Sequence, residues 1–357
     1  MTQSRVHAFL ELAVQQGGSD LHLVSGHTPH IRIHGRLQPV RFRELSVEDV
    51  EDLLHECMTD AQRRQLDEKC SADFAYSIDG LGRFRVNAYR HASGLAAALR
   101  VVPAKVPSFE SLGLPASIKS LVLQPKGLIL VTGATGSGKS TTLAGIVDLI
   151  NSSRKGHIIT LEDPIEFLHD YKKCVVTQRE IGSHAESFSE ALRDAVREDP
   201  DVILVGELRD LESISLALTA AETGIQVLAT LHTGSARRTI DRIVNVFPER
   251  RQDQIRSMLA DSLRLVISQR LARTIEGHGR VAAHDILVNT HAAATMIRNG
   301  NSHKLESVMQ TGGAAGMQTL DAALKDLVRR KVIGVEEAIE LALDPSQFDM
   351  LARDAAA

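Results

Sequence analysis

The sequence predicts an α/β protein in which a phosphate-loop domain with a mainly parallel sheet follows a smaller α+β domain. From residue 127 onward, apolar strand candidates alternate with helix candidates, a pattern that is typical of parallel sheets. Residues 133–141 read GATGSGKST and fit the phosphate-loop pattern G-x-x-x-x-G-K-[ST] between a strand candidate and a helix candidate. Before residue 103, polar and apolar residues alternate within the strand candidates, which indicates a mainly antiparallel sheet.

The first domain is expected to span residues 1–102. It opens with an amphipathic helix, and a longer helical stretch begins at Ser46, where S-V-E-D resembles a capping box, and runs to Glu68. The strand candidates of this domain are residues 20–26, 30–37, 39–45, 72–79, 82–90 and 95–102. Residues 103–115 contain three prolines and little periodicity, so we expect them to form the linker between the domains.

The second domain is expected to span residues 116–357. Its strand candidates are the runs 127–132, 157–163, 174–180, 202–207 and 226–233, and its helices include 187–198 and 211–224. The runs VILVG and QVLATL show no polar alternation, as expected of central strands whose two faces are covered by helices. Open parallel sheets bind ligands at the carboxyl ends of their strands, so the residues that follow these runs are candidates for a site.

Length, charge and cysteine content limit the class of protein. The chain has 357 residues, 43% of them hydrophobic, which is enough for two domains. With 41 basic and 45 acidic residues, the net charge of -4 gives no electrostatic case for nucleic acid as the main partner. Cys57, Cys70 and Cys174 are far apart and suggest neither a disulfide framework nor a zinc site, so a reducing cytoplasm is the expected compartment. We expect no signal peptide and no membrane span, so a role at a membrane would require a partner.

The glycines of the phosphate loop allow backbone N–H groups to approach the phosphates of a nucleotide. Lys139 is expected to reach the β- and γ-phosphates, and Ser140 is expected to bind Mg²⁺. The candidate nucleotide-binding residues are Gly133, Thr135, Gly136, Ser137, Gly138, Lys139, Ser140 and Thr141. A plain glycine-rich turn is the alternative, and the flanking strand and helix argue against it. The expected ligands are therefore ATP and Mg²⁺.

Three polar residues follow predicted strands of the second domain. Glu207 follows VILVG and is assigned water activation or metal support, Glu162 lies at the end of HIITLED and could hold Mg²⁺, and His232 follows QVLATL. The candidate metal-binding residues are thus Ser140, Glu162 and Glu207. The alternatives are a helix-capping carboxylate for Glu207, a turn with exposed acids for Glu162 and a structural histidine for His232.

Hydrolysis of ATP also requires positive charge near the oxygens of the transition state. Candidate arginines of the first domain are Arg83, Arg85 and Arg90 on GRFRVNAYR and Arg100 on LAAALRVV. Two interpretations remain open. These side chains are either solvated on the strand faces or include an arginine finger that one domain, of the same or a neighbouring subunit, contributes to the γ-phosphate.

Nearly the whole chain resembles the type IV pilus retraction ATPases, the PilT-like family within the secretion ATPase superfamily. The resemblance is carried by the runs SDLHL (19–23), GRFRVNAYR (82–90), GATGSGKST (133–141), TLEDPIEF (160–167), TQREIG (177–182), ALRDAVREDPDVILVGELRD (191–210) and AETGIQVLATLHT (221–233). The runs RIVNVFP, VISQRL, GRVAAHDIL and GMQTLD continue it.

The resemblance implies a PAS-like first domain, a RecA-like ATPase domain and a homohexamer with nucleotide held between the two domains. It implies that Glu207 is the glutamate of the second nucleotide motif, Glu162 the acidic-box glutamate and His232 the histidine-box residue. It also implies that Arg85 and Arg100 are the first-domain arginines that close on the phosphate. The implied function is a motor at the inner face of the cytoplasmic membrane that acts on the pilus platform protein, together with other pilus ATPases, and drives twitching motility.

One stretch departs from the family pattern. The signature AIRNLIRE reads AAATMIRN at residues 292–299, which keeps Ile297 and Arg298 but loses the first arginine and the final acid. An accessory ATPase that modulates another retraction motor is therefore one alternative. A ring-shaped DNA translocase is an alternative of a different class, but the net charge of -4 and the 3% aromatic content argue against it.

Overall fold

The structure, a computed structural model, describes residues 4–33, 35–102, 106–277 and 279–351, which form two compact units. The first unit contains the chain up to Lys105 and the segment Pro164–Leu168, and the second contains Val106–Asp163 and the chain from His169 onward. Residues 103–105 of the predicted linker lie outside the described residues. In its remaining part, the short 3₁₀ helix Phe109–Leu112 buries both of its end residues.

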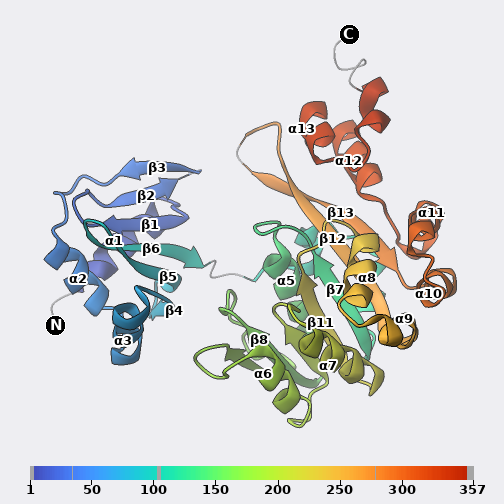
Figure 1. Cartoon of the computed structure of the whole chain (residues 1–357). Helices are drawn as coiled ribbons and strands as arrows, with labels where there is room; N and C mark the ends of the chain where they lie inside the picture. The colour runs from blue at the N-terminus through green and yellow to red at the C-terminus, as the bar shows by residue number, and fades with distance from the viewer. Residues whose placement is uncertain (1–3, 34, 103–105, 278, 352–357) are drawn as a thin grey trace. The chain divides into compact units, whose positions relative to one another are not determined.

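The first unit is built on a six-stranded antiparallel sheet with the order β3-β2-β1-β6-β5-β4 (Figure 1). Its strands are β1 (Asp20–Val24), β2 (His30–Ile33), β3 (Arg36–Pro39), β4 (Ser71–Ile78), β5 (Gly82–His91) and β6 (Gly94–Val102). Alternate residues such as Leu21, Phe84 and Leu99 are fully buried. They cluster with side chains of α1 (Arg5–Gln15), α2 (Val47–His55) and α3 (Asp60–Lys69). The predicted α+β architecture with an antiparallel sheet is confirmed.

Three expectations for this unit are wrong. Residues 30–37 are not one strand, because Gly35 at φ 81° turns the chain from β2 directly into β3. Residues 39–45, expected to form the next strand, lie almost wholly outside β3, which ends at Pro39. The helical stretch 46–68 is two helices, because Thr59 caps α3 anew by accepting from Gln62 N. The capping box at Ser46 is confirmed by its side chain accepting from the backbone N–H of Asp49.

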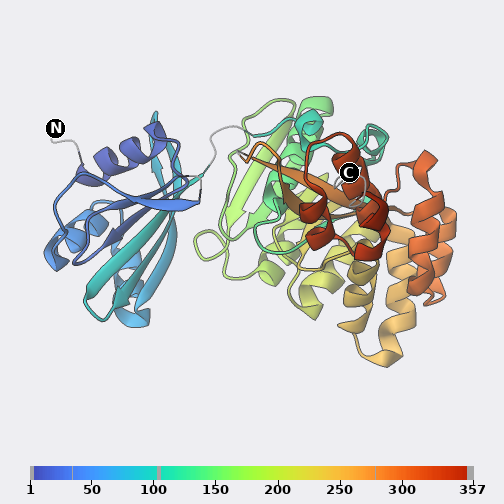
Figure 2. The same ribbon diagram turned by 90° about the horizontal axis from the view of Figure 1, so that it is seen from above.

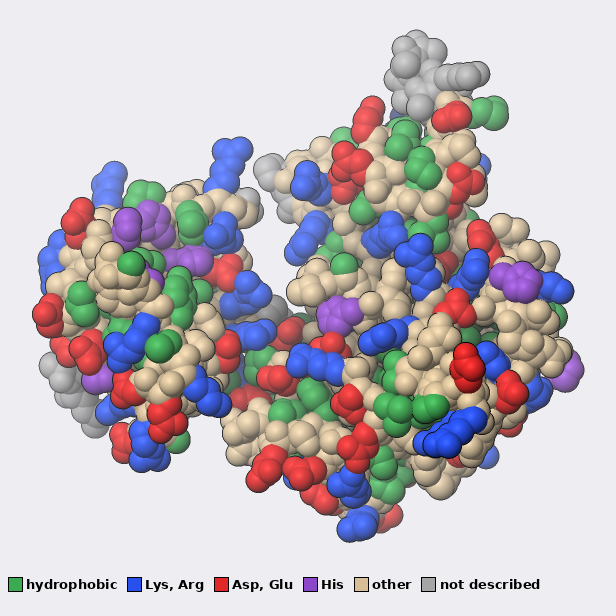
Figure 3. Space-filling view, in the orientation of Figure 1, with side chains coloured by type: hydrophobic (Ala, Val, Ile, Leu, Met, Phe, Trp, Pro, Cys, Tyr) green, Lys and Arg blue, Asp and Glu red, His purple; other side chains and the backbone are tan. Residues whose placement is uncertain are grey.

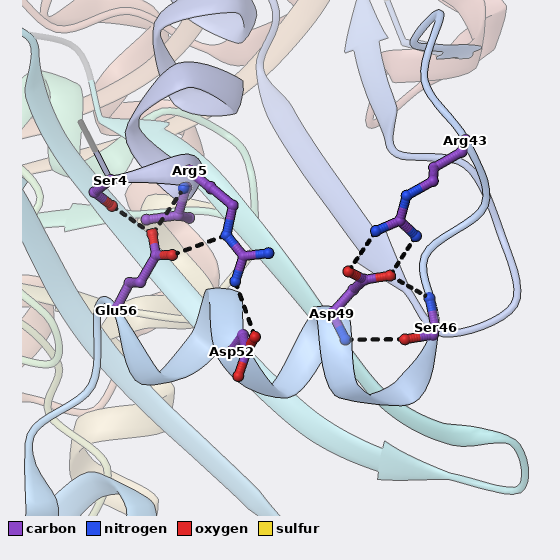
Figure 4. A network of polar contacts seen from close by, with 8 residues as sticks. Ser4, Arg5, Arg43, Ser46, Asp49, Asp52 and Glu56 are labelled. Carbon is purple, nitrogen blue, oxygen red and sulfur yellow. Dashed lines mark hydrogen bonds and ion pairs between the residues drawn. The ribbon is translucent and has the colours of Figure 1, made fainter. Parts of the chain in front are cut away.

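Charged side chains join α1 to α2 and pair at the start of α2 (Figure 4). Arg5 Nη2 lies 3.0 Å from Asp52 Oδ2, and Arg5 Nε donates to Glu56 Oε1 at 3.3 Å. Arg43 pairs with Asp49, and its hydrogen bonds hold the pKa of Asp49 well below the ordinary value. Exposed pairs of this kind contribute little stability each.

The second unit is built on a seven-stranded sheet with the order β13-β12-β7-β11-β10-β8-β9. Every neighbouring pair is parallel except β12 and β13. The strands are β7 (Gly127–Thr132), β8 (Gly156–Glu162), β9 (Cys174–Glu180), β10 (Val202–Val205), β11 (Gln226–Leu231), β12 (Leu263–Arg273) and β13 (Arg280–Val288). β7, β10 and β11 are buried along their whole length. The predicted mainly parallel sheet with covered central strands is confirmed.

Helices surround this sheet, and α7, α8 and α9 lie in front of it in the view of Figure 1. The helices of the unit are α4 (Ile118–Val122), α5 (Lys139–Ser153), α6 (Phe188–Ala195), α7 (Leu211–Glu222), α8 (Ala236–Asn245), α9 (Glu249–Ser262), α10 (His291–Arg298), α11 (Leu305–Thr311), α12 (Leu320–Arg329) and α13 (Val335–Leu341). Ser187 and Asp210 cap α6 and α7 through their side-chain oxygens, which explains where these two predicted helices begin.

The C-terminal helices α12 and α13 lie beside the β12–β13 hairpin (Figures 1 and 2). Asp285 of β13 is buried and accepts hydrogen bonds from Ala236 N at 2.8 Å and Leu320 N at 3.1 Å. These two residues begin α8 and α12. One carboxylate therefore binds the N-terminal ends of two helices, where an acceptor is most favourable.

Candidate nucleotide-binding and catalytic site

The predicted phosphate loop lies between β7 and α5. Gly133, Gly136 and Gly138 have φ values of 149°, 77° and 87°, a region in which side chains are strained. A Cβ on Gly133 would also lie 2.5 Å from Gln269 O and from Ser137 Oγ. The curl of the loop therefore depends on glycine at these positions.

Lys139 is the first residue of α5, and its Nζ donates to the carbonyl oxygens of Gly133 and Ala134, both at 3.0 Å. Its ammonium group thus lies over the loop, next to the N-terminal end of a helix, where anions are favoured. Ser140 is partly exposed in the first turn of α5. Of the other predicted loop residues, Ser137 is buried, whereas the exposed ones are Thr135, Gly136 and Thr141.

A residue that the sequence did not single out holds this loop from β12. Gln269 is 2% exposed, and its Nε2 donates to Ser137 O at 2.6 Å. Its Oε1 accepts from Thr142 Oγ1 at 2.9 Å. One amide of β12 thus binds both the loop and the helix that follows it. Gln269 lies in the run VISQRL, in which no spacing or residue type marks it as a loop contact.

Glu207 and His232 follow different strands and are in contact. Glu207 Oε1 lies 3.2 Å from His232 Nε2, and Glu207 Oε2 accepts from Arg209 Nε at 2.8 Å. The Glu207 side chain is 20% exposed, against 43% for His232. A carboxylate held from two sides keeps a fixed orientation while it remains open to water. Arg209 is a partner that the sequence did not indicate.

Glu162 ends β8 and is half-buried. Its Oε1 accepts from Thr160 Oγ1 at 2.6 Å and from Gln178 Nε2 at 3.2 Å. A Cβ on Gly206, the residue before Glu207, would lie 3.4 Å from Glu162 Cα. The ends of β8 and β10 therefore approach each other closely.

The strand order brings these residues to one edge of the sheet. β7, β11, β10 and β8 are successive parallel neighbours, so the phosphate loop, His232, Glu207 and Glu162 all follow carboxyl ends at the same edge. His232 follows the strand that lies between the strand of the loop and the strand of Glu207. Ser140, Glu162 and Glu207 supply hydroxyl and carboxylate oxygens, the donor set that suits Mg²⁺ together with phosphate oxygens.

Arg85 and Arg100 belong to the first unit and are directly opposite each other on β5 and β6. Arg100 is in turn opposite Asp20 of β1, and its Nε donates to Asp20 Oδ1 at 2.8 Å. Arg32 Nε lies 3.9 Å from the other oxygen of Asp20. Burial alone would raise the pKa of Asp20, but hydrogen bonds from Arg100 and Ser19 outweigh it and lower this pKa. Asp20, which lies in the run SDLHL, is therefore the structural partner of Arg100.

The exposure of these two arginines is compatible with both interpretations given for them. The Arg100 side chain is 67% exposed, and that of Arg85 is 41% exposed. The Asp20 contact uses Nε of Arg100, so the outer nitrogens of the guanidinium remain at the surface of the unit.

Residues 292–299 lie on α10 and at its C-terminal cap. Ile297 is buried, and Arg298 Nη2 lies 2.6 Å from Asp261 Oδ1 on α9. The two residues that keep the family pattern here thus have packing and ion-pair contacts within the second unit.

The surface of the second unit drawn in Figure 3 mixes Lys and Arg side chains with Asp and Glu side chains. A mixed surface of this kind does not form a continuous basic track for a nucleic-acid backbone on that face. Among the helices that the structure describes, none has the length and apolar character needed to span a membrane.

Comparisons with known proteins give one consistent result. The family model described as type II/IV secretion system protein matches residues 2–340. The chain is similar to the type IV pilus retractation ATPase PilT of Pseudomonas aeruginosa, with 50% identity over 95% of this chain and 98% of that protein. It is also similar to a twitching motility protein of Neisseria gonorrhoeae, with 48% identity over 87% of this chain and 83% of that protein. Among solved structures, that of the pilus retraction motor PilT with bound ADP has a TM-score of 0.91 at 43% identity, covering 98% of this chain and 99% of that one.

Proposed function

Because the chain belongs to the type II/IV secretion system protein family, we propose that it is a homohexameric ATPase motor that retracts type IV pili. The observation that carries this proposal is the end-to-end likeness to a named retraction ATPase, at 50% identity over 95% of the chain. The edge of the sheet supports it independently, since the phosphate loop and the Glu207–His232 pair follow neighbouring strand ends. The chain is a nucleotide-binding P-loop ATPase of this family.

The proposed site assigns a role to each residue, and Glu207 has two. The loop amides and Lys139 bind the phosphates, and Ser140, Glu162 and Glu207 hold Mg²⁺ directly or through water. Mg²⁺, when bound with ATP, supplies positive charge to the phosphate oxygens. Glu207 orients a water molecule and accepts its proton as the water attacks the γ-phosphate. His232 contacts Glu207 at 3.2 Å and connects its position to the state of the phosphate.

The proposed partners follow from the family to which the chain belongs. They are further copies of the chain in the ring, the platform protein of the pilus machine and other pilus ATPases. We place the motor at the inner face of the cytoplasmic membrane, where the platform protein recruits it. Nucleic acid is not a proposed partner, because the net charge is -4 and the drawn face of the second unit is electrostatically mixed.

Arg100→Ala is expected to lower the ATPase rate of the assembled ring by about 10³–10⁵-fold if Arg100 is an arginine finger. The same substitution is expected to leave the low rate of a monomeric preparation unchanged. Steady-state phosphate release from both preparations, separated by size-exclusion chromatography, measures the difference. An equal loss in the two preparations would contradict a finger that acts across subunits.

Asp20→Asn is the matched control, because Arg100→Ala also removes the charged partner of a buried carboxylate. Both variants lose the ion pair, and this loss destabilises the first unit in each of them. Only Arg100→Ala removes the guanidinium, so the ATPase rate of Asp20→Asn should stay much closer to wild type. If the two variants lose activity in parallel, Arg100 serves the fold and not the reaction.

Expression of this chain in a strain that lacks its retraction motor is expected to restore twitching. The Lys139→Ala variant, which lacks the loop cation, is the control and should not restore it. Twitching zones and cell-surface pilus content are the measurements. Restoration only when another retraction motor is also present would instead identify an accessory ATPase, the alternative raised by residues 292–299.

A further inference from the structure

We propose that Gln269 is a positioning residue that holds the phosphate loop in its nucleotide-binding shape. The inference rests on the proposed phosphate loop and goes beyond it by adding a residue outside the loop, on β12. Gln269 is 127 residues away in sequence from Thr142 and 132 away from Ser137, the two residues that its amide contacts. Its amide contacts Ser137 and Thr142, so its proposed effect acts through the loop.

The loop meets Gln269 at three points. The side-chain amide donates to Ser137 O at 2.6 Å, and the backbone oxygen of Gln269 lies where a Cβ of Gly133 would come within 2.5 Å. A Cβ on Gly138 would lie 3.1 Å from Gln269 Nε2. The first, middle and last parts of the glycine run therefore all lie against one residue of β12. These contacts restrict movement of the loop backbone toward β12.

The orientation of the amide is fixed as well. Oε1 of Gln269 accepts from Thr142 Oγ1 at 2.9 Å, which leaves Nε2 directed toward Ser137 O. Thr142 is 3% exposed and Gln269 is 2% exposed, so water does not compete for either bond. A hydrogen bond in such surroundings is costly to lose, because the carbonyl left behind has no solvent to replace the donor.

The cross-strand neighbour of Gln269 adds no charge to this region. His284 of β13 is directly opposite Gln269 and is 2% exposed. Burial lowers the pKa of His284 to about 4, so its ring is neutral at physiological pH. The Gln269 amide therefore contacts the loop beside a neutral ring, with no charge from this neighbour.

Arg270, the next residue of β12, provides a control on the same strand. Its Nη1 donates to Leu341 O at 2.6 Å, at the end of α13. Successive side chains of a strand point to opposite faces, so Arg270 lies away from the loop contact. Arg270→Met therefore removes a hydrogen bond of β12 without removing any contact to the phosphate loop.

Gln269→Met is expected to weaken binding of ADP to the full-length chain about tenfold, the factor that corresponds to one hydrogen bond. Titration with a fluorescent ADP analogue measures it. Amide hydrogen exchange of residues 133–141 in the nucleotide-free protein should become faster in this variant, while the core strands stay protected. Arg270→Met should change neither measurement. Wild-type ADP affinity in Gln269→Met, or an equal loss in Arg270→Met, would overturn the inference.

Gln269→Glu tests the same bond through pH and serves if the methionine variant does not fold. A carboxylate at this place faces the Ser137 carbonyl as a second acceptor, whereas a protonated carboxyl group can donate to it. Burial raises the pKa of such a group, so ADP binding by Gln269→Glu should approach that of wild type as the pH falls from about 8 to about 6. A constant ratio across this range would mean that Gln269 only fills space.

Lys139→Ala distinguishes a failure of the proposed phosphate loop from a failure of the role proposed for Gln269. If Lys139→Ala retains ADP binding, the proposed phosphate loop itself is wrong. If Lys139→Ala loses binding while Gln269→Met retains it, the loop stands and only the role of Gln269 fails.

Discussion

Lys139→Ala is expected to abolish measurable ATP hydrolysis, with a loss of about 10²–10³-fold or more in kcat. The lysine is the cation of the phosphate loop, and its Nζ lies 3.0 Å from the carbonyl oxygens of Gly133 and Ala134. Alanine removes the charge that the proposed site directs at the β- and γ-phosphates, and it also leaves these two carbonyl groups without their donor. Steady-state phosphate release and titration with ADP measure the two consequences separately.

Lys126→Ala is the matched control for this experiment. Lys126 is exposed and precedes β7, whereas the phosphate loop follows β7. The control removes a lysine of the same unit at the opposite end of the same strand, so its ATPase rate should equal that of wild type. Unchanged ATPase activity in Lys139→Ala would refute the assignment of the loop.

Glu207→Gln is expected to reduce turnover by about 10²–10⁴-fold while nucleotide affinity stays close to that of wild type. Glutamine keeps the length of the side chain and can still contact His232 and Arg209, but it cannot accept a proton from water. The substitution thus removes the proposed base and retains the geometry observed around it. Single-turnover hydrolysis together with ATP binding under non-hydrolysing conditions distinguishes the two effects.

Glu222→Gln supplies the control, because Glu222 is an exposed carboxylate at the end of α7. It changes the net charge by the same amount and should hydrolyse ATP at the wild-type rate. A Glu207→Gln variant that retains more than about a tenth of the wild-type turnover would argue against proton transfer to this residue.

The elements that the sequence predicted well are those whose signal is local. Apolar runs predicted β7, β10 and β11, the last two as central strands because they lack alternation, and all three are buried at every position. The phosphate loop was predictable because its glycine positions and flanking elements are fixed by one short pattern. The ends of parallel strands then indicated Glu162, Glu207 and His232, and the structure brings the last two into contact.

The parts that could not be predicted depend on which strands become neighbours. Gln269 reaches the loop because β12 pairs with β7, and nothing within either strand specifies that pairing. Asp20 contacts Arg100 because β1 pairs with β6, although the two residues are 80 positions apart in the sequence. The break between α2 and α3 was missed for a different reason. Thr59 lies inside a continuous helical pattern, and only its accepted hydrogen bond from Gln62 N shows that a new helix begins there.

The two units have hydrophobic cores of their own, one assembled around residues such as Leu21 and Phe84 and the other around Ile129 and Val205. A protein organised in this way unfolds in more than one cooperative step. Heating should therefore produce two calorimetric transitions rather than one, and a substitution should shift the transition of the unit that contains it. A single midpoint temperature fitted to both transitions would not show whether Arg100→Ala had destabilised the first unit or Lys139→Ala the second.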